Sequence, residues 1–215
     1  MIYSYSFLSA LDQCPRKAQH KFVLRDVPKE DTPALAYGRR THEVFEHRLK
    51  EGKWPAGHDF NPAKWEPFAL ALDPRHPHVE VPLAMTINGR GCGFWDPNAF
   101  LRGKVDVAVT SGEKCLIIDW KTGKPREDPL ELEIFSLLIK ANNSDLSSFT
   151  GRYVWLKELR VGKEHVVSPV RAWDYVKRRD EQVKGLERQG GEWPANPTGL
   201  CPWCPVKTCE HWREK

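Results

Sequence analysis

The strongest constraint on the fold is a predicted β-hairpin in the middle of the chain, over residues 100–119. Valine recurs at every second position in its first half, which places the valines on one face of a strand and Asp106 on the other. Ser111-Gly112-Glu113 is typical of a turn, and the apolar run Cys115–Asp119 is typical of a short buried strand. Pairing of the two strands is expected to bring Asp106 and Asp119 to the same end of a sheet.

Helical and extended segments surround this hairpin. Helices are predicted over residues 5–23 with a junction at Pro15, over 34–51, around 62–72, over 127–142 and over 169–189. Further strands are predicted over residues 79–88, 152–158 and 163–167, and residues 24–33 are expected to form a loop. This order predicts an α/β fold with a mixed central sheet, flanking helices and a helical crossover between strands.

Composition narrows the class of protein. A chain of 215 residues, 40 % hydrophobic and 29 % charged, fits one globular domain with a sizeable core. It has no apolar run near the roughly 20 residues that span a bilayer, and its N-terminus does not resemble a signal peptide. We therefore expect a cytoplasmic protein, of a bacterium or of an infected host cell, with no membrane contact. The net charge of +4 is compatible with a polyanionic partner.

Two carboxylates and a lysine form the first candidate site. Cleavage of a phosphodiester with a hard divalent ion needs carboxylates to hold that ion, and Asp106 and Asp119 can supply two. Lys121 lies two residues beyond Asp119 and therefore faces the same side of a strand. There its charge can assist the reaction at phosphorus. Taken alone, the same residues equally fit a solvated strand face with a surface ion pair.

Clustered cysteines form the second candidate site. Cys201, Cys204 and Cys209 lie within nine residues of one another, which is close enough to wrap one metal centre. A 4Fe–4S cluster or a tetrahedral Zn²⁺ needs a fourth ligand, which is a distant cysteine for either group or His211 for Zn²⁺. A disulfide between Cys201 and Cys204 is the third interpretation.

Five segments, taken together in this order, resemble the RecB-like branch of the PD-(D/E)XK nuclease superfamily. The similarity includes the CRISPR-adaptation nucleases that carry an iron–sulfur cluster and related phage and bacterial exonucleases. The segments are Ser4-Tyr5-Ser6 through Cys14-Pro15-Arg16-Lys17, Gly38–His42 (G-x-x-x-H), Gly103–Asp106 (G-x-x-D), Asp119–Gly123 (D-x-K-T-G) and Cys201–Cys209 (C-x-x-C-x4-C).

The resemblance implies a restriction-endonuclease-like core and a role for each matching residue. His42, Asp106, Asp119 and the backbone carbonyl of Trp120 would bind Mg²⁺ or Mn²⁺, and Lys121 would act in catalysis with the two aspartates. Cys14, Cys201, Cys204 and Cys209 would hold a 4Fe–4S cluster, with structural Zn²⁺ as the alternative. Residues 1–215 would form one nuclease domain, with its catalytic core over 24–191 and its cysteine-cluster region formed by 1–23 together with 192–215.

DNA contacts are predicted beside this site. The family often carries Q-x-x-x-Y on the helix after D-x-K, whereas this chain has Glu131 and Phe135 at those positions, which are kept as candidate DNA contacts. Arg39 and Arg40 adjoin His42 and are candidate phosphate ligands. Further basic residues, which a solvated helix face explains equally well, are Arg48, Lys50 and Lys53 beside His42 and Arg171, Lys177, Arg178, Arg179, Lys184 and Arg188 near the C-terminus. Glu80 is expected to be a solvated strand residue rather than an outer carboxylate of the site.

Three hypotheses for function follow. The first is a metal-dependent DNA exonuclease that acts on single-stranded ends in replication or recombination, beside the proteins of those processes. The second is a catalytically weak DNA-binding or assembly module that keeps the nuclease fold. The third, a zinc-ribbon-like interaction protein, explains the cysteines but not the middle of the chain.

Overall fold

A computed structural model describes residues 1–28, 32–58 and 61–214. The chain divides into two compact units, and each is treated by itself. The first contains Met1–Ile2 and Asp31–Ala172, and the second contains Tyr3–Glu30 and Trp173–Lys215. The predicted loop over 24–33 lies partly outside the described residues.

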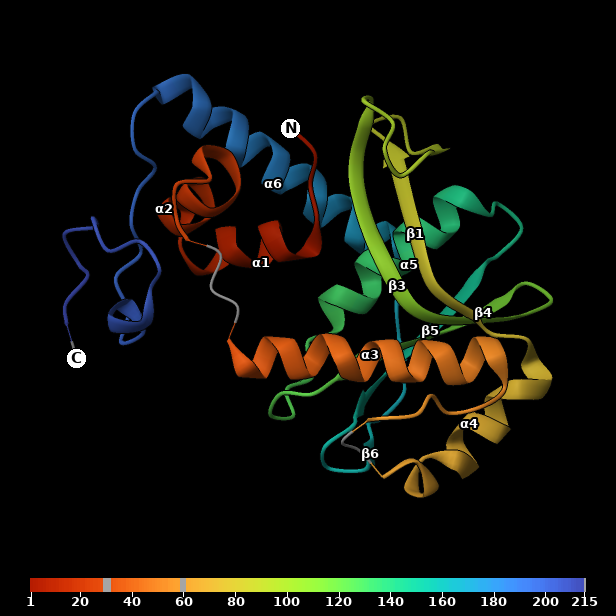
Figure 1. Cartoon of the computed structure of the whole chain (residues 1–215). Coiled ribbons are helices and arrows are strands. Elements are labelled where there is room, and N and C mark those ends of the chain that lie inside the picture. The colour runs from red at the N-terminus through yellow and green to blue at the C-terminus, as the bar shows by residue number, and fades with distance from the viewer. Residues whose placement is uncertain (29–31, 59–60, 215) are drawn as a thin grey trace. The chain divides into compact units, whose positions relative to one another are not determined.

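A seven-stranded mixed sheet forms the centre of the first unit (Figure 1). Its strands are β1 (His78–Thr86), β2 (Gly91–Cys92), β3 (Ala99–Ser111), β4 (Lys114–Lys121), β5 (Ser148–Trp155), β6 (Arg160–Val161) and β7 (His165–Val166), in the spatial order β2-β1-β3-β4-β5-β6 with β7 also paired to β5. β3 and β4 form the predicted antiparallel hairpin, with Gly112 in the left-handed conformation at its turn. β4 and β5 are parallel and therefore need the crossover that α5 (Pro129–Asn142) supplies. The predicted mixed α/β fold is confirmed.

Helices pack on both faces of this sheet. On one face, α3 (Pro33–Glu51) and α4 (Glu66–Leu72) contribute Phe45 and Leu72 to a core that includes Ile118 and Trp120. On the other face, α5 places Leu132 against Gly151 of β5. The predicted helix around 62–72 is confirmed as α4, preceded by the 3₁₀ turn η2 (Pro62–Lys64) and followed by η3 (Asp73–Arg75).

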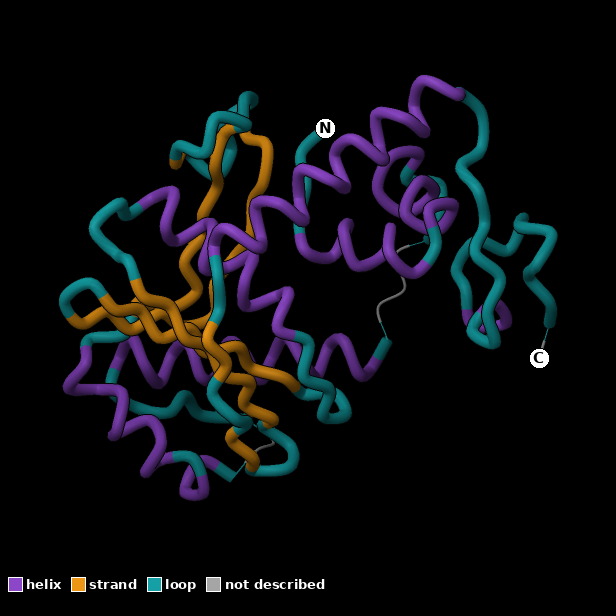
Figure 2. The backbone as a smooth tube through the Cα atoms, turned by 180° about the vertical axis from the view of Figure 1, so that it is seen from behind, coloured by secondary structure: helices purple, strands orange, loops and turns teal. Residues whose placement is uncertain are grey.

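The second unit is built mainly from helices and turns, drawn in purple and teal in Figure 2. It contains α1 (Tyr5–Gln13), α2 (Pro15–Ala18), the π-helical segment η1 (Gln19–Leu24), most of α6 (Pro169–Gln189) and the 3₁₀ turn η4 (Cys201–Trp203). Ser4 caps α1 by accepting a hydrogen bond from the Phe7 backbone N–H, and Pro15 begins α2, so the predicted junction is confirmed. In the part of the chain that the structure describes, no helix has both the length and the apolar character needed to cross a bilayer.

Candidate active site

The hairpin brings Asp106 and Asp119 to the same end of the sheet, as its sequence predicts. Its register pairs Val107 with Ile118, so the next positions outward are Asp106 on β3 and Asp119 on β4. The Trp120 backbone N–H donates a hydrogen bond of 2.8 Å to Asp106 Oδ2, which fixes the direction of that carboxylate. Asp106 is 8 % exposed and Asp119 is 3 % exposed, so neither lies on a solvated strand face.

His42 approaches the same place from α3. Its Nδ1 atom lies 3.6 Å from Asp106 Oδ1 and 3.6 Å from Glu80 Oε1. One ligand atom from each of these residues lies within 4.8 Å of the others, a spacing that lets a single ion contact all three. The neighbours of His42 on the helix hold it there, since Thr41 and Phe45 are both buried.

Glu80 is the site residue that sequence reasoning missed. The expectation of a solvated strand residue was wrong, because Glu80 is only 9 % exposed. It lies on β1 between the Val79–Val107 and Val81–Val105 pairs, at the level of Asp106 on β3. Its backbone has a φ of +54°, a left-handed conformation that is strained for glutamate and rare inside a strand. The position of Glu80 opposite Asp106 on the neighbouring strand could have identified it as a site residue, but the pairing register of β1 with β3 cannot be read from the sequence.

The charges of the site are strongly coupled. Burial alone lowers the pKa of His42, but interaction with Asp106 and Glu80 outweighs burial and raises that pKa to about 10. Burial raises the pKa of Glu80, whereas His42 and Lys104 lower it by more. Burial also raises the pKa of Asp119 well above its usual value, and the charge of Asp106 raises it further. Asp119, beside Asp106, is therefore the carboxylate that lacks full compensation by positive charge.

Lys121 is held between two carboxylates. Its Nζ atom lies 2.6 Å from Asp119 Oδ2 and 2.8 Å from Glu131 Oε2 on α5. Burial lowers the pKa of Lys121, but Asp119 and Glu131 outweigh it and raise the pKa well above its usual value. The side chain therefore remains a cation at neutral pH and is suited to stabilise negative charge rather than to accept a proton.

The structure separates the predicted DNA contacts into different environments. Arg39 and Arg40 are exposed on α3. Glu131 serves as a partner of Lys121 inside the site. Phe135 is 6 % exposed and packs against Gly103, which speaks against a contact with DNA.

Arg48, for which phosphate contact and a solvated helix face were the two alternatives, fits neither of them. It is 1 % exposed, and its guanidinium donates hydrogen bonds to Glu66 of α4 and to Asp73. These ion pairs fasten the C-terminal half of α3 to the segment that follows it.

Two glycines of the predicted motifs have steric reasons to be glycine. A Cβ atom at Gly38 would lie 3.1 Å from Thr122 Oγ1, so α3 passes close to the end of β4. A Cβ atom at Gly103 would lie 3.0 Å from Leu138 of α5. The motifs therefore encode the close approach of two helices to the sheet as well as the ligands.

The donor set fits a divalent cation. Glu80 Oε1 is buried and accepts no hydrogen bond from the described residues. Carboxylate oxygens with one imidazole nitrogen suit a divalent metal cation, whose charge would offset the buried negative charge. Metal binding by the Trp120 backbone carbonyl stays a prediction.

The four predicted cluster cysteines line one cavity of the second unit, with a volume of about 380 Å³. Cys14 comes from the end of α1, and the other three come from the C-terminal segment. His211, Trp203 and Trp212 line the same cavity. All six cysteines of the chain are free thiols in the structure, so a disulfide between Cys201 and Cys204 is not formed.

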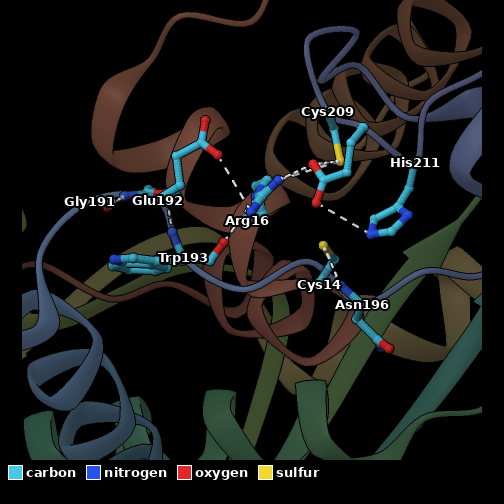
Figure 3. Close-up of polar contacts among 10 residues, drawn as sticks. Cys14, Arg16, Gly191, Glu192, Trp193, Asn196, Cys209 and His211 are labelled. Carbon is cyan, nitrogen blue, oxygen red and sulfur yellow. Dashed lines mark hydrogen bonds and ion pairs between the residues drawn. The ribbon is translucent and has the colours of Figure 1, made fainter.

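Backbone and side-chain donors point at these sulfurs (Figure 3). The Asn196 N–H donates to Cys14 Sγ at 3.3 Å, and the Thr198 N–H donates to Cys201 Sγ at 3.3 Å. Arg16 joins the two chain segments, because it donates to the Trp193 carbonyl and pairs with Glu210 beside Cys209. Such donors stabilise thiolates that bind a metal.

The fold and the acidic centre define an α/β protein with a candidate site for a divalent cation at the end of two central strands. The model of the PD-(D/E)XK nuclease superfamily matches residues 56–209, and the chain belongs to that superfamily. The match includes Asp106, Asp119 and Lys121, whereas His42 and Cys14 precede it.

A crystal structure of SSO0001 is similar in fold, with a TM-score of 0.50. It is 12 % identical, and the similarity covers 99 % of this chain and 87 % of that chain. At this identity the likeness shows the fold alone. A comparison with curated protein sequences finds no match.

Proposed function

We propose that this protein is a Mg²⁺- or Mn²⁺-dependent deoxyribonuclease that acts as an exonuclease on single-stranded DNA ends during replication or recombination. The observation that carries the proposal is the grouping of His42, Glu80 and Asp106 within reach of one ion, with Asp119 beside Asp106 and the charged Lys121 against Asp119. Asp119 is the fourth protein ligand candidate. The superfamily supplies the nuclease activity in general, and the donor set supports the choice of metal.

Each residue of the centre has a distinct task in this proposal. His42, Glu80, Asp106, Asp119 and the Trp120 carbonyl hold the cation. When bound, a divalent cation supplies positive charge that stabilises the charge developing on a phosphodiester. Lys121, oriented by Asp119 and Glu131, would add a second positive charge to stabilise the charge developing on that phosphodiester.

We further propose that Cys14, Cys201, Cys204 and Cys209 hold a 4Fe–4S cluster with a structural role. The four thiols line one cavity, and backbone donors point at the sulfurs of Cys14 and Cys201, which supports a bound metal group. Anaerobically purified protein is expected to be brown and to contain iron, whereas colourless protein with one equivalent of zinc would contradict the cluster.

End-blocked oligonucleotides test the proposed nuclease most directly. With Mn²⁺, the protein is expected to degrade labelled single-stranded DNA from a free end and to leave a strand blocked at that end intact. Asp106→Asn, which keeps the shape of the side chain but removes its charge, is expected to abolish degradation. If wild-type protein binds DNA but degrades neither DNA nor RNA under any divalent cation, the chain is a binding or assembly module instead.

A further inference from the structure

An arm of β-strands extends from the sheet beyond the acidic centre. It consists of the outer ends of β1 and β3, the short strand β2 and the loop 93–98, and Figure 1 shows it reaching away from β4 and β5. Its loop is firmly built, since the Asp96 N–H donates to the Gly93 carbonyl and the Ala99 N–H donates to the Asp96 carbonyl. The arm is therefore a fixed part of the first unit.

One face of the arm is covered by α5. Asn142 of that helix donates a hydrogen bond of 3.0 Å to the Ala84 carbonyl, and a Cβ atom at Gly91 would collide with Asn142. A Cβ atom at Gly103 would likewise lie close to Leu138 of the same helix. Because side chains alternate along a strand, Arg102 and Lys104 project from the opposite face.

That opposite face ends in an aromatic pair, of which Phe94 is half-buried and Trp95 is exposed. The rings of Phe94 and Trp95 meet edge to face with their centroids 5.0 Å apart. The Arg102 guanidinium lies 5.4 Å from the Phe94 ring centre and 5.3 Å from the Trp95 ring centre. Trp95 is 80 % exposed, which is a large exposure for tryptophan and leaves its indole free to contact a ligand.

Positive charge connects this pair to the acidic centre. Lys104 forms an ion pair with Glu80, which itself lies against His42. Arg102 follows two residues along β3, about 7 Å further from the centre. A chain of phosphates that leaves the centre along β3 would therefore meet Lys104, then Arg102, then the aromatic pair.

We propose that Phe94, Trp95 and Arg102 form a platform that binds an unpaired nucleobase and its phosphate, several nucleotides from the acidic centre. This inference rests on the proposed nuclease function and adds a binding site for its single-stranded substrate outside the acidic centre. An indole ring stacks on the face of a base, and that face is covered in a duplex but open in a single strand. Asp96 is the acidic neighbour, but its side chain accepts a hydrogen bond from the Asn98 N–H and so stays within the loop.

Binding of a fluorescein-labelled oligothymidylate of 20 nucleotides, longer than the roughly 4–16 nucleotides of a typical single-stranded site, tests the platform. Fluorescence anisotropy with EDTA present separates binding from cleavage. Trp95→Ala is expected to raise Kd about tenfold, and Trp95→Phe, which keeps an aromatic face, is expected to restore most of the affinity. Val166→Ala is the matched control, because Val166 is 77 % exposed but lies on β7 rather than on the arm.

Arg102→Ala gives an independent readout. Loss of one phosphate contact lowers the slope of log Kd against log salt by about 0.7 for a single strand. If Trp95→Ala and Arg102→Ala leave both Kd and the salt slope unchanged while their melting temperatures match the wild type, the platform is disproved.

Hydrolysis of thymidine 5′-p-nitrophenyl phosphate by the wild-type protein separates this inference from the function on which it rests. That small diester is too short to reach from the acidic centre to Trp95, so its hydrolysis reports on the proposed nuclease alone. Hydrolysis together with unchanged oligonucleotide binding by Trp95→Ala would overturn only the platform. Absence of hydrolysis together with weakened binding by Trp95→Ala would overturn the nuclease and support the platform.

Discussion

The acidic centre and the cysteine cavity assemble their ligands in different ways. The carboxylates of the acidic centre lie on paired strands and are 3 to 9 % exposed. The cysteines lie on short turns and segment ends, and all four of them are only partly buried. In the described stretch from Trp193 to Glu214, only Trp193 and Val206 are buried.

The acidic centre is therefore ordered by the packing of the fold, whereas we expect the cysteine segment to be ordered by the metal group that it binds. Sheet register and ion pairs hold the acidic centre before any ligand binds, so the loss of one ligand there changes chemistry more than stability. The cysteine segment buries too little apolar surface to order itself, so a bound metal group contributes its folding free energy. Four predictions test this contrast, in order of decreasing effect.

Asp119→Asn is expected to reduce cleavage about a thousandfold, equivalent to about 4 kcal/mol, without reducing the melting temperature. The charge of Asp119 is destabilising in the metal-free protein, since burial and Asp106 raise its pKa. Cleavage assays and thermal unfolding measure the two effects, with the exposed Asp145→Asn as control. A large loss of stability in Asp119→Asn would contradict the contrast.

Cys204→Ser is expected to lower the free energy of unfolding of the second unit by about 4 kcal/mol, because a metal group that joins Cys14 to Cys201 closes a very long loop. Urea unfolding and limited proteolysis measure the loss. Cys92→Ser removes a cysteine outside the cavity and should change neither stability nor metal content. Equal stability of Cys204→Ser and wild type would show that the segment orders itself.

Arg48→Met is expected to destabilise the first unit by about 3 kcal/mol, since it leaves Glu66 and Asp73 without their buried partner. Lys50→Met on the same helix removes only an exposed pair with Glu46 and should cost less than about 0.5 kcal/mol. Urea denaturation compares them. Similar costs for the two variants would mean that α3 is not anchored through Arg48.

Cation binding at the acidic centre is expected to strengthen with pH, by up to about tenfold per pH unit below the pKa of His42 near 10. A ligand histidine must lose its proton, and the folded protein holds that proton tightly. The same raised pKa stabilises the metal-free fold at low pH, and this stabilisation is lost as pH rises through about 10. Titration calorimetry with Mn²⁺ measures both the affinity and the released proton.

His42→Gln provides the control for that pH dependence. It removes the titrating group from the centre but keeps a side chain of similar reach. Binding that is equally dependent on pH in the wild type and in His42→Gln would exclude His42 as a ligand.

Local periodicity explains which parts of the fold were predictable. The strands β3 and β4, their turn and the position of α3 follow from alternation, turn residues and caps within short windows. The same local pattern placed Asp106 beside Asp119. The short strands β2 and β6 carry only two residues each and leave no periodic signal.

The sequence by itself therefore determined the hairpin and its two carboxylates, because side-chain alternation and turn geometry act between near neighbours. Only the tertiary structure decided that Glu80 is buried against His42, that Arg48 is buried between two carboxylates and that Glu131 holds Lys121. Those environments depend on the pairing of β1 with β3 and on the packing of α3 and α5 against the sheet. The sequence does not show whether a charged residue faces water or a buried partner, because its environment is set by packing between segments that are far apart in the chain.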